Sequence, residues 1–236
     1  MANYKHGVYA RELATSLTAP VSGTAGLQVV VGTAPVNMLS EPEKAVNVPL
    51  LVNSYKEAVE AVGYNGDFEK FTLCEAVSAA FQVVGTGPLV LINVLDPAKH
   101  TDEVAETTIP VNAGVAILET VGILPASLSV KMEATALKAG TDYTTAFNDD
   151  GSLSILVLST GAGAKATTLT VSGKKIAPEK VTSADIVGSV DTQTGKETGL
   201  EVVRQVYPKY SMVPGILTAP RYSTDATVAA ALQAKT

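Results

Sequence analysis

Two short apolar runs decide the fold of this chain: Gly26-Leu-Gln-Val-Val-Val-Gly32 and Pro88-Leu-Val-Leu-Ile-Asn-Val-Leu95. Glycines bound the first run, and Asp96-Pro97 follows the second. Runs of this length and character are typical of strands that are buried on both faces, as in a parallel sheet covered by helices. We therefore expect two buried strands.

Amphipathic helices are predicted between and around these strands. Ser54-x-x-Glu57 matches a capping box, in which the hydroxyl and the carboxylate satisfy main-chain amides at a helix start. A second box, Thr72-x-x-Glu75, begins a longer helix whose apolar stripe runs from Leu73 to Val84 and which ends at Gly85. Strands alternating with helices predict an α/β domain with an open, largely buried sheet flanked by helices.

The pattern changes between residues 102 and 188, where short runs rich in Thr, Ser, Val and Ala predict strands. Asn148-Asp-Asp-Gly151 is a strong hairpin-turn signal between two of them. The expected strands are Gly114 to Thr120, Leu128 to Met132, Tyr143 to Phe147, Leu153 to Leu158 and Thr167 to Val171. They predict an inserted all-β sandwich or barrel-like domain.

The helical period returns after this insert. Thr198-x-x-Glu201 predicts a third capped helix, ended by Pro208. A short strand at 214–218 and a final helix capped by Ser223 or Thr224 follow. The expected organisation is an extended N-terminal arm (1–20), an α/β domain (21–101 plus 189–236) and an inserted β domain (102–188).

Composition narrows the function classes. Hydrophobic residues make up 46 % of the 236 residues and charged residues 17 %, with a net charge of −6. The mean hydropathy of +0.24 is high, but the apolar runs fall short of the roughly 20 residues that span a bilayer, so we expect no membrane insertion. The 17 Lys and Arg are scattered, whereas nucleic-acid binders gather basic residues in a patch, so nucleic acid is not an expected partner.

Sequence motifs for catalysis, cofactor binding or metal binding are weak. Cys74 is the single cysteine, and with two histidines the chain lacks the usual ligands of a zinc site. Cys74 shares the apolar face of its predicted helix, which favours a buried small hydrophobe over a nucleophile. Gly161-Ala-Gly-Ala-Lys165 lacks phosphate-loop spacing and is predicted to be a turn, and Gly85-Thr-Gly87 to be a helix stop. We expect no catalytic, cofactor or metal site.

Asp96 and His100 offer the best alternative. They follow a buried strand, at the edge where open α/β sheets tend to bind ligands, and an Asp can orient a His as general base. The alternative hypothesis is therefore an α/β enzyme or nucleotide-binding protein centred on these two residues. The sequence contains no G-x-S-x-G nucleophile motif to accompany them.

The N-terminal arm suggests assembly instead. It contains the apolar-leaning residues Tyr4, Val8, Tyr9 and Leu13. Such a segment can pair with its own sheet or add a strand to the exposed sheet edge of a neighbour, because main-chain hydrogen bonds alone provide affinity. The sequence leaves both possibilities open.

Several ordered motifs resemble contractile tail sheath proteins of tailed bacteriophages, defective prophages and R-type bacteriocins, and more distantly of other contractile injection systems. The motifs are Gly7-Val-Tyr9, Ala25-Gly-Leu, Val31-Gly-Thr-Ala-Pro-Val36, Asn47-Val-Pro49, Leu51-Val-Asn-Ser54, Phe71-Thr-Leu73, Gly87-Pro88, Val94-Leu-Asp-Pro97, Thr198-Gly-Leu200, Pro214 and Ala219-Pro220. The predicted β insert matches only in position and character, and its binding a receptor as a surface adhesin is compatible with the resemblance.

The resemblance implies a non-enzymatic structural subunit. Such subunits assemble in the bacterial cytoplasm as stacked hexameric rings around a tail tube. When the baseplate is triggered, the sheath contracts and drives the tube through a bacterial envelope. Implied partners are other copies of the chain, the tail tube protein and the baseplate, and Gly7 to Leu13 would be the arm linking neighbouring subunits.

Three departures from the family pattern stand out. His6 replaces a frequent proline before Gly-Val-Tyr, and Arg221 replaces a frequent glycine after the late Ala-Pro. Sheath proteins also continue beyond the helix ending near Lys235 into a further domain. We therefore expect a truncated subunit that lacks this C-terminal domain.

Overall fold

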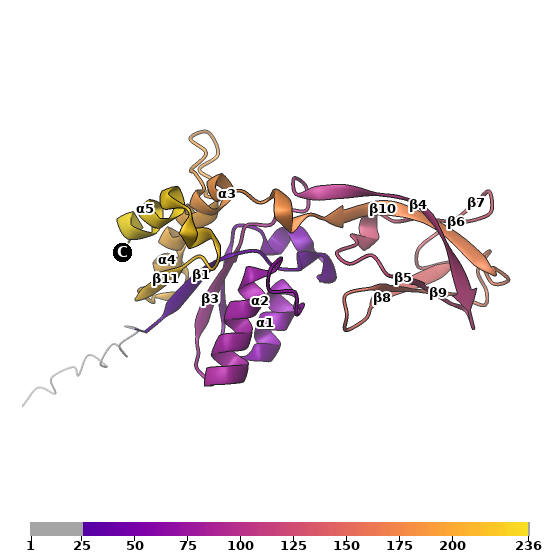
Figure 1. Cartoon of the computed structure of the whole chain (residues 1–236), viewed down its shortest axis with the longest axis horizontal. Helices are drawn as coiled ribbons and strands as arrows, with labels where there is room; N and C mark the ends of the chain where they lie inside the picture. Colours follow the sequence, from indigo (N-terminus) through magenta and orange to yellow (C-terminus); the bar gives the residue numbers. More distant parts are fainter. Residues whose placement is uncertain (1–25, 236) are drawn as a thin grey trace, which may run out of the picture.

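The computed structural model describes residues 26–235 and is elongated, with a mixed helix-and-sheet part at one end and a β part at the other (Figure 1). The strands are β1 (Gln28–Gly32), β2 (Pro49–Val52), β3 (Leu89–Asn93), β4 (Thr101–Asn112), β5 (Val115–Leu118), β6 (Ser129–Met132), β7 (Thr135–Leu137), β8 (Tyr143–Phe147), β9 (Leu153–Val157), β10 (Thr168–Ile176) and β11 (Ile216–Thr218). They form a four-stranded and a seven-stranded sheet.

The helices lie almost wholly in the first part. The α-helices are α1 (Tyr55–Val62), α2 (Thr72–Val77), α3 (Ser183–Val187), α4 (Val206–Tyr210) and α5 (Ala226–Lys235), and the π-helix η3 spans Ser78–Val84. The 3₁₀-helices are η1 (Val36–Met38), η2 (Pro42–Ala45), η4 (Pro125–Ser127), η5 (Pro178–Lys180), η6 (Gly199–Gln205) and η7 (Tyr222–Thr224). No helix among residues 26–235 has the length and apolar character needed to cross a membrane.

The four-stranded sheet has the order β11-β1-β3-β2. β1 pairs in parallel with both β3 and β11, whereas β2 runs antiparallel to β3. The two apolar runs therefore form central strands, as expected. The edge strand β2 was not predicted, because its four residues lie in a segment whose prolines and asparagines indicate a connection.

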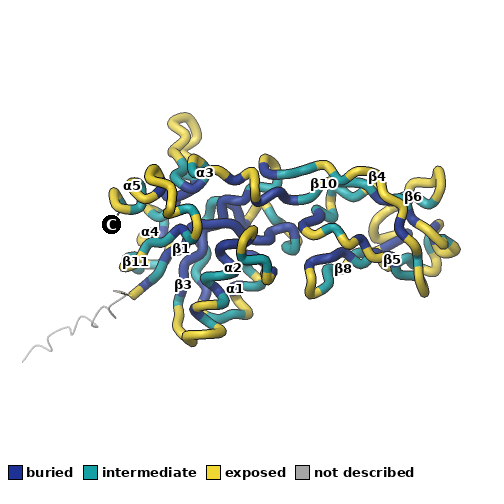
Figure 2. Tube along the Cα trace, in the orientation of Figure 1, coloured by how far each residue is buried: buried dark blue, intermediate teal, exposed yellow. Residues whose placement is uncertain are grey.

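Both faces of this sheet are buried, which confirms the reason for predicting these strands. Val29 and Val31 of β1 face one core cluster, which includes Ile186, Leu200 and Val228 from α3, η6 and α5. Val30 faces the other cluster, under α1 and α2. Figure 2 shows this buried centre as a dark blue band. The part is thus a helix–sheet–helix sandwich of three layers.

The capping box at Ser54 is confirmed with one change. The Ser54 hydroxyl oxygen accepts a hydrogen bond from the Glu57 amide at 3.2 Å. The Glu57 carboxylate reaches the amide of Asn53 at 2.8 Å, one residue before the expected partner.

The prediction of a capping box at Thr72 is wrong, because the Thr72 hydroxyl bonds a residue distant in the sequence instead of the start of its own helix. Phe71 occupies the N-cap position of α2, and Thr72 is the first helical residue. Its hydroxyl oxygen accepts a hydrogen bond from the Thr33 amide at 3.2 Å. This places α2 so close to β1 that a Cβ on Gly32 would lie 2.2 Å from the Thr72 hydroxyl oxygen, so only glycine fits there.

The predicted apolar stripe of this helix holds for Leu73 and Val77, which are buried. It fails at Val84, which is 66 % exposed. The helix changes to a π-helix at Ser78, and each π turn contains more residues than an α turn, so later side chains rotate away from the original face. Gly85 ends the helix with φ 72°, as expected.

The third predicted cap also differs. Thr198 precedes η6, but its hydroxyl bonds the main chain of Ser189 instead of capping the helix. The helical segment passes Pro208 and ends at Tyr210. Pro208 is tolerated because it lies in the first turn of α4, where an amide has no intrahelical partner.

The final helix α5 is present, but Asp225 caps it. The Asp225 carboxylate accepts hydrogen bonds from the amides of Thr227 and Val228 at 2.7 and 3.4 Å. The predicted caps Ser223 and Thr224 lie in the preceding 3₁₀ turn, η7.

The second part is a curled, wholly antiparallel sheet of order β7-β6-β10-β4-β5-β9-β8 around one core cluster. The five predicted strands are present as β5, β6, β8, β9 and β10. The 12-residue β4 was missed, because most of its side chains are exposed and give no apolar alternation. A bridge between Ala139 and Tyr143 brings the ends of β7 and β8 together.

The two parts touch beyond the strands that join them. The Asn37 side-chain amide donates to the Ile123 carbonyl at 3.2 Å. The β8–β9 turn is the predicted hairpin, with Gly151 at φ 85°, and a Cβ there would lie 2.8 Å from the Asn65 side chain. Residues 181 and 186 belong to the core of the four-stranded sheet. The domain boundaries at 102 and 188 stay a prediction.

Candidate assembly surface

The side chains of Asp96 and His100 do not bond to each other as the alternative hypothesis requires. The His100 Nδ1 atom accepts a hydrogen bond from the Asp96 main-chain amide at 3.0 Å, and the Asp96 carboxylate accepts from the Ala98 amide at 2.8 Å. The carboxylate facing the His100 Nε2 atom is that of Asp185, at 3.6 Å. The Nδ1 atom thus bonds the turn after β3, and the Nε2 atom faces α3.

These residues line a cavity of about 500 Å³, together with Ser189 and Lys196. His100 itself is buried, with 6 % of its surface exposed. Within residues 26–235, no three His, Cys, Asp or Glu side chains gather closely enough to hold a metal ion.

The other sequence candidates behave as structural elements. Cys74 is fully buried, as predicted, and burial raises the pKa of its thiol to about 12. A thiol with so high a pKa is a poor nucleophile at neutral pH. Residues 161–165 form the predicted turn between β9 and β10, and Gly85 ends η3.

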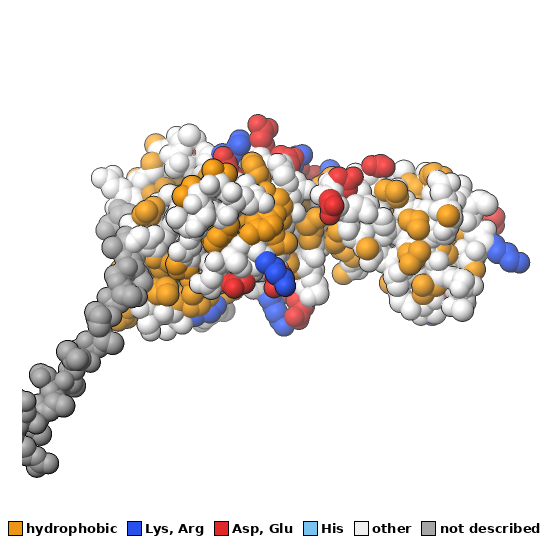
Figure 3. Space-filling view, turned by 90° about the horizontal axis from the view of Figure 1, so that it is seen from below, with side chains coloured by type: hydrophobic (Ala, Val, Ile, Leu, Met, Phe, Trp, Pro, Cys, Tyr) orange, Lys and Arg blue, Asp and Glu red, His pale blue; other side chains and the backbone are white. Residues whose placement is uncertain are grey.

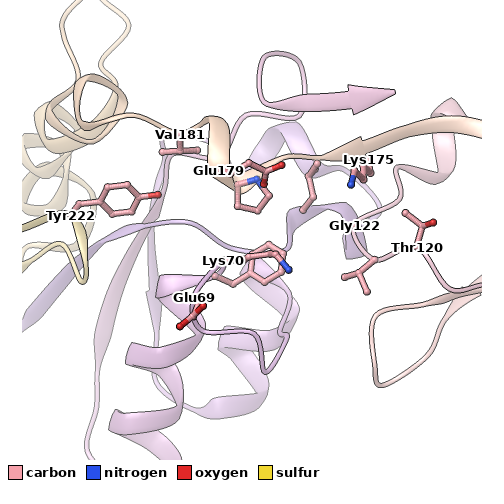
Figure 4. Close-up of a pocket in the computed structure, with 12 residues that line it drawn as sticks. Glu69, Lys70, Thr120, Gly122, Lys175, Glu179, Val181 and Tyr222 are labelled. Atoms are coloured by element: carbon pink, nitrogen blue, oxygen red, sulfur yellow. The ribbon is translucent and has the colours of Figure 1, made fainter. Parts of the chain in front are cut away.

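A cavity at the junction of the two parts was not predicted. It measures about 690 Å³. Figure 4 shows Glu69 and Lys70 on one side, Thr120, Gly122 and Lys175 on another, and Tyr222 toward the helical end. Burial raises the pKa of the Tyr222 hydroxyl. The lining mixes acidic and basic side chains and contains no His, Cys or Ser.

The two edges of the four-stranded sheet differ sharply. At the β2 edge, the Tyr210 hydroxyl donates to the Pro49 carbonyl at 2.7 Å and accepts from the Leu51 amide at 3.2 Å. The Lys209 ammonium group also donates to the Pro49 carbonyl, at 3.0 Å. Side chains of α4 therefore cover this edge.

The β11 edge is open among the described residues, because no strand of the structure lies on its outer side. The Ile216 amide donates to the Leu27 carbonyl across the β1–β11 pair. Because main-chain groups alternate in direction along a strand, the amide and carbonyl of Leu217 face away from β1. They remain available to a further strand.

Hollows lie beside β11. One, of about 540 Å³, is lined by Val203, Tyr207, residues 213–217 and the end of α5. The other, of about 530 Å³, is lined by Ala76, Ala79, Pro220 and Leu232. Leu217 lines both hollows, so a strand added at this edge has space for its side chains.

Exposed apolar side chains surround the open edge. Tyr207, Val213 and Ile216 are 62 %, 59 % and 48 % exposed. All three line the larger of the two hollows. Figure 3 shows further apolar side chains on one face of the molecule, over both of its parts. An open edge with an apolar border has the features that suit an added strand, and we call it the candidate strand-acceptor surface.

The predicted linking arm lies outside the described residues, and with it Tyr4, Gly7, Val8, Tyr9 and Leu13. The sequence predicted this segment as a possible added strand, but it did not predict which edge of the sheet is open and which is covered. Arg221, which departs from the frequent glycine that the resemblance leads us to expect, has φ 66°. Its backbone thus lies in a region that glycine adopts more readily.

The comparisons with known proteins bear on the whole chain. No protein-family profile matches it. The chain is 29 % identical to the tail sheath protein of Burkholderia phage BcepMu, over 99 % of this chain and 46 % of that protein. The resemblance in the sequence motifs is thereby confirmed, and the chain is a relative, over nearly its entire length, of a phage tail sheath protein.

Proposed function

We propose that this chain is a structural subunit of a contractile phage-type tail sheath. In this role it associates with copies of itself into stacked hexameric rings around a tail tube, and contraction of the stack drives the tube through a bacterial envelope. The subunit assembles in the bacterial cytoplasm and becomes part of the virion tail. Tail tube protein and baseplate are its other partners in this proposal.

The match to a tail sheath protein over 99 % of the chain carries this proposal. The match covers less than half of the relative, so rings, tube binding and contraction are proposed for the whole gene product. The acceptor surface at β11 supports self-association, because its outward amide and carbonyl, its hollows and its apolar border all suit another strand.

The arm supplies the strand in this proposal. Gly26 is the first described residue, and the Leu27 carbonyl already accepts hydrogen bonds from the Gly215 and Ile216 amides. The described chain therefore begins beside the start of β11. We assign Tyr4 to Leu13 of one copy to the β11 edge of a second copy, and a return onto the same copy is the competing outcome.

Electron microscopy of the gene product that contains this chain tests the sheath assignment. We expect rings or striated tubes at high protein concentration. A protein that stays monomeric at every concentration, although circular dichroism shows an intact fold, would contradict the assignment.

A further inference from the structure

Tyr210 reaches from the end of α4 to a strand about 160 positions earlier in the sequence. Its hydroxyl bonds two main-chain groups of β2, the Pro49 carbonyl and the Leu51 amide. The Lys209 ammonium group shares the same carbonyl and lies 5.3 Å from the centre of the Tyr210 ring. Both side chains therefore donate to the same carbonyl group of the β2 edge.

The bonded groups are those that an incoming strand needs. In an antiparallel sheet, the amide and carbonyl of every second residue of an edge strand point outward. At the β2 edge these belong to residues 49, 51 and 53. Pro49 has no amide, the Leu51 amide is bonded to Tyr210, and the Asn53 amide is bonded to the Glu57 carboxylate at 2.8 Å. Each outward amide from 49 to 53 is therefore absent or occupied.

We propose that Tyr210, with Lys209, is an edge lock that closes β2 to strand addition and leaves β11 as the strand-acceptor edge of this sheet. A sheet with one acceptor edge takes one strand, and so adds copies in one direction. With two acceptor edges the same sheet would take two strands and cross-link copies into irregular aggregates. The identity of the partner, a strand of a second copy, rests on the proposed function, whereas the closure of β2 does not.

The hydroxyl, not the ring, carries the proposed lock. The Tyr210 ring packs against the core cluster under the sheet, and Tyr210→Phe keeps that packing while removing both hydrogen bonds. Tyr64→Phe is the matched control, because it also removes a tyrosine hydroxyl, one that donates to the Gln82 side chain at 3.5 Å and not to β2. Leu217→Pro removes the outward amide of β11, and proline is tolerated on an edge strand where its nitrogen faces outward.

Amide hydrogen exchange on the full chain, measured by NMR, is the first test. In the wild type we expect the hydrogen bond to the Tyr210 hydroxyl to protect the Leu51 amide from exchange. Tyr210→Phe should speed Leu51 exchange about five- to tenfold, the effect of losing one hydrogen bond, whereas Tyr64→Phe should leave it unchanged. A Leu51 amide that exchanges equally fast in the wild type and in Tyr210→Phe would overturn the lock.

Sedimentation velocity is the second test. Tyr210→Phe should form larger species than the wild type, and these should persist in the Leu217→Pro background, because they use β2. If Leu217→Pro abolishes them, they use β11 and the lock is refuted. A wild type that never associates contradicts the proposed function, yet Leu51 exchange and the larger species of Tyr210→Phe still decide the lock.

Discussion

At the scale of single residues, Arg221 holds a backbone conformation that costs stability. Its φ of 66° lies where a Cβ meets the main chain. Its ion pairs with Glu69 and Glu75, at 3.9 and 3.5 Å, are exposed and contribute little. We expect Arg221→Gly to raise the free energy of unfolding by roughly 0.5 to 1 kcal/mol, measured by urea denaturation.

Arg221→Ala separates the backbone from the side chain. It removes the same ion pairs but keeps a Cβ at positive φ, so it should not stabilise the protein. If alanine stabilises as much as glycine, the lost side chain and not the backbone angle explains the gain.

Asp185 makes stability depend on pH. Burial of its carboxyl group favours the neutral acid, but hydrogen bonds from the Thr182 hydroxyl and amide, at 2.7 and 2.8 Å, outweigh this and lower its pKa. A lowered folded-state pKa stabilises the fold above the unfolded pKa of about 3.9, and this contribution is lost as pH falls through the folded value. The wild type should therefore lose more stability between about pH 6 and pH 3 than Asp185→Asn does.

Urea titrations of both proteins at the two pH values measure this difference. Other carboxylates with lowered pKa values, such as Asp102, are present in both proteins and cancel in the comparison. Equal losses in the two proteins would show that Asp185 does not contribute to the pH dependence.

At the scale of elements, the β4–β5 hairpin has a turn residue that is poorly suited to its conformation. Ala113 and Gly114, between the strands, have φ of 51° and 83°. Two consecutive positive φ angles match a type I′ turn, which favours Asn-Gly. Ala113→Asn should raise the thermal midpoint and increase the free energy of unfolding by up to about 1 kcal/mol. Ala113→Val should lower the thermal midpoint, because a β-branched residue resists positive φ. A scanning-calorimetry result with both variants shifted the same way contradicts this.

Elements with strong local patterns could be predicted from the sequence, and those set by distant contacts could not. The central strands, the Ser54 cap and the turn at Gly151 follow from local apolar runs, a hydroxyl position and a glycine. The Thr72 cap fails because Thr33, 39 positions earlier, takes its hydroxyl. The exposed strand β4 shows no alternation to detect.

At the scale of the whole molecule, the acceptor surface lay beyond sequence reasoning. The state of each sheet edge depends on which strands pair and which side chains reach them. Tyr210 closes one edge from about 160 positions away, and the other stays open because no described strand lies beyond β11. The arm was predictable as a possible donor, because its apolar character is local.

Deletion of Met1 to Leu13 tests whether the arm of one copy pairs with the β11 edge of another. If the arm of one copy occupies β11 of the next, the deletion should abolish long assemblies in electron micrographs. Replacement of the same residues by a Gly/Ser linker of equal length should do the same, because a flexible linker lacks the side chains that fill the hollows beside β11. Leu217→Pro should weaken assembly from the acceptor side.

The exchange rate of the Leu217 amide separates the two destinations of the arm. An arm donated to a second copy protects this amide more strongly as protein concentration rises, because the pairing is bimolecular. An arm that folds back onto its own sheet protects it equally at all concentrations, and the protection disappears only in the deletion. If tubes still form undiminished after the deletion, the arm does not link the subunits. The exposed side chains of Tyr207, Val213 and Ile216 would then be the next contact to test.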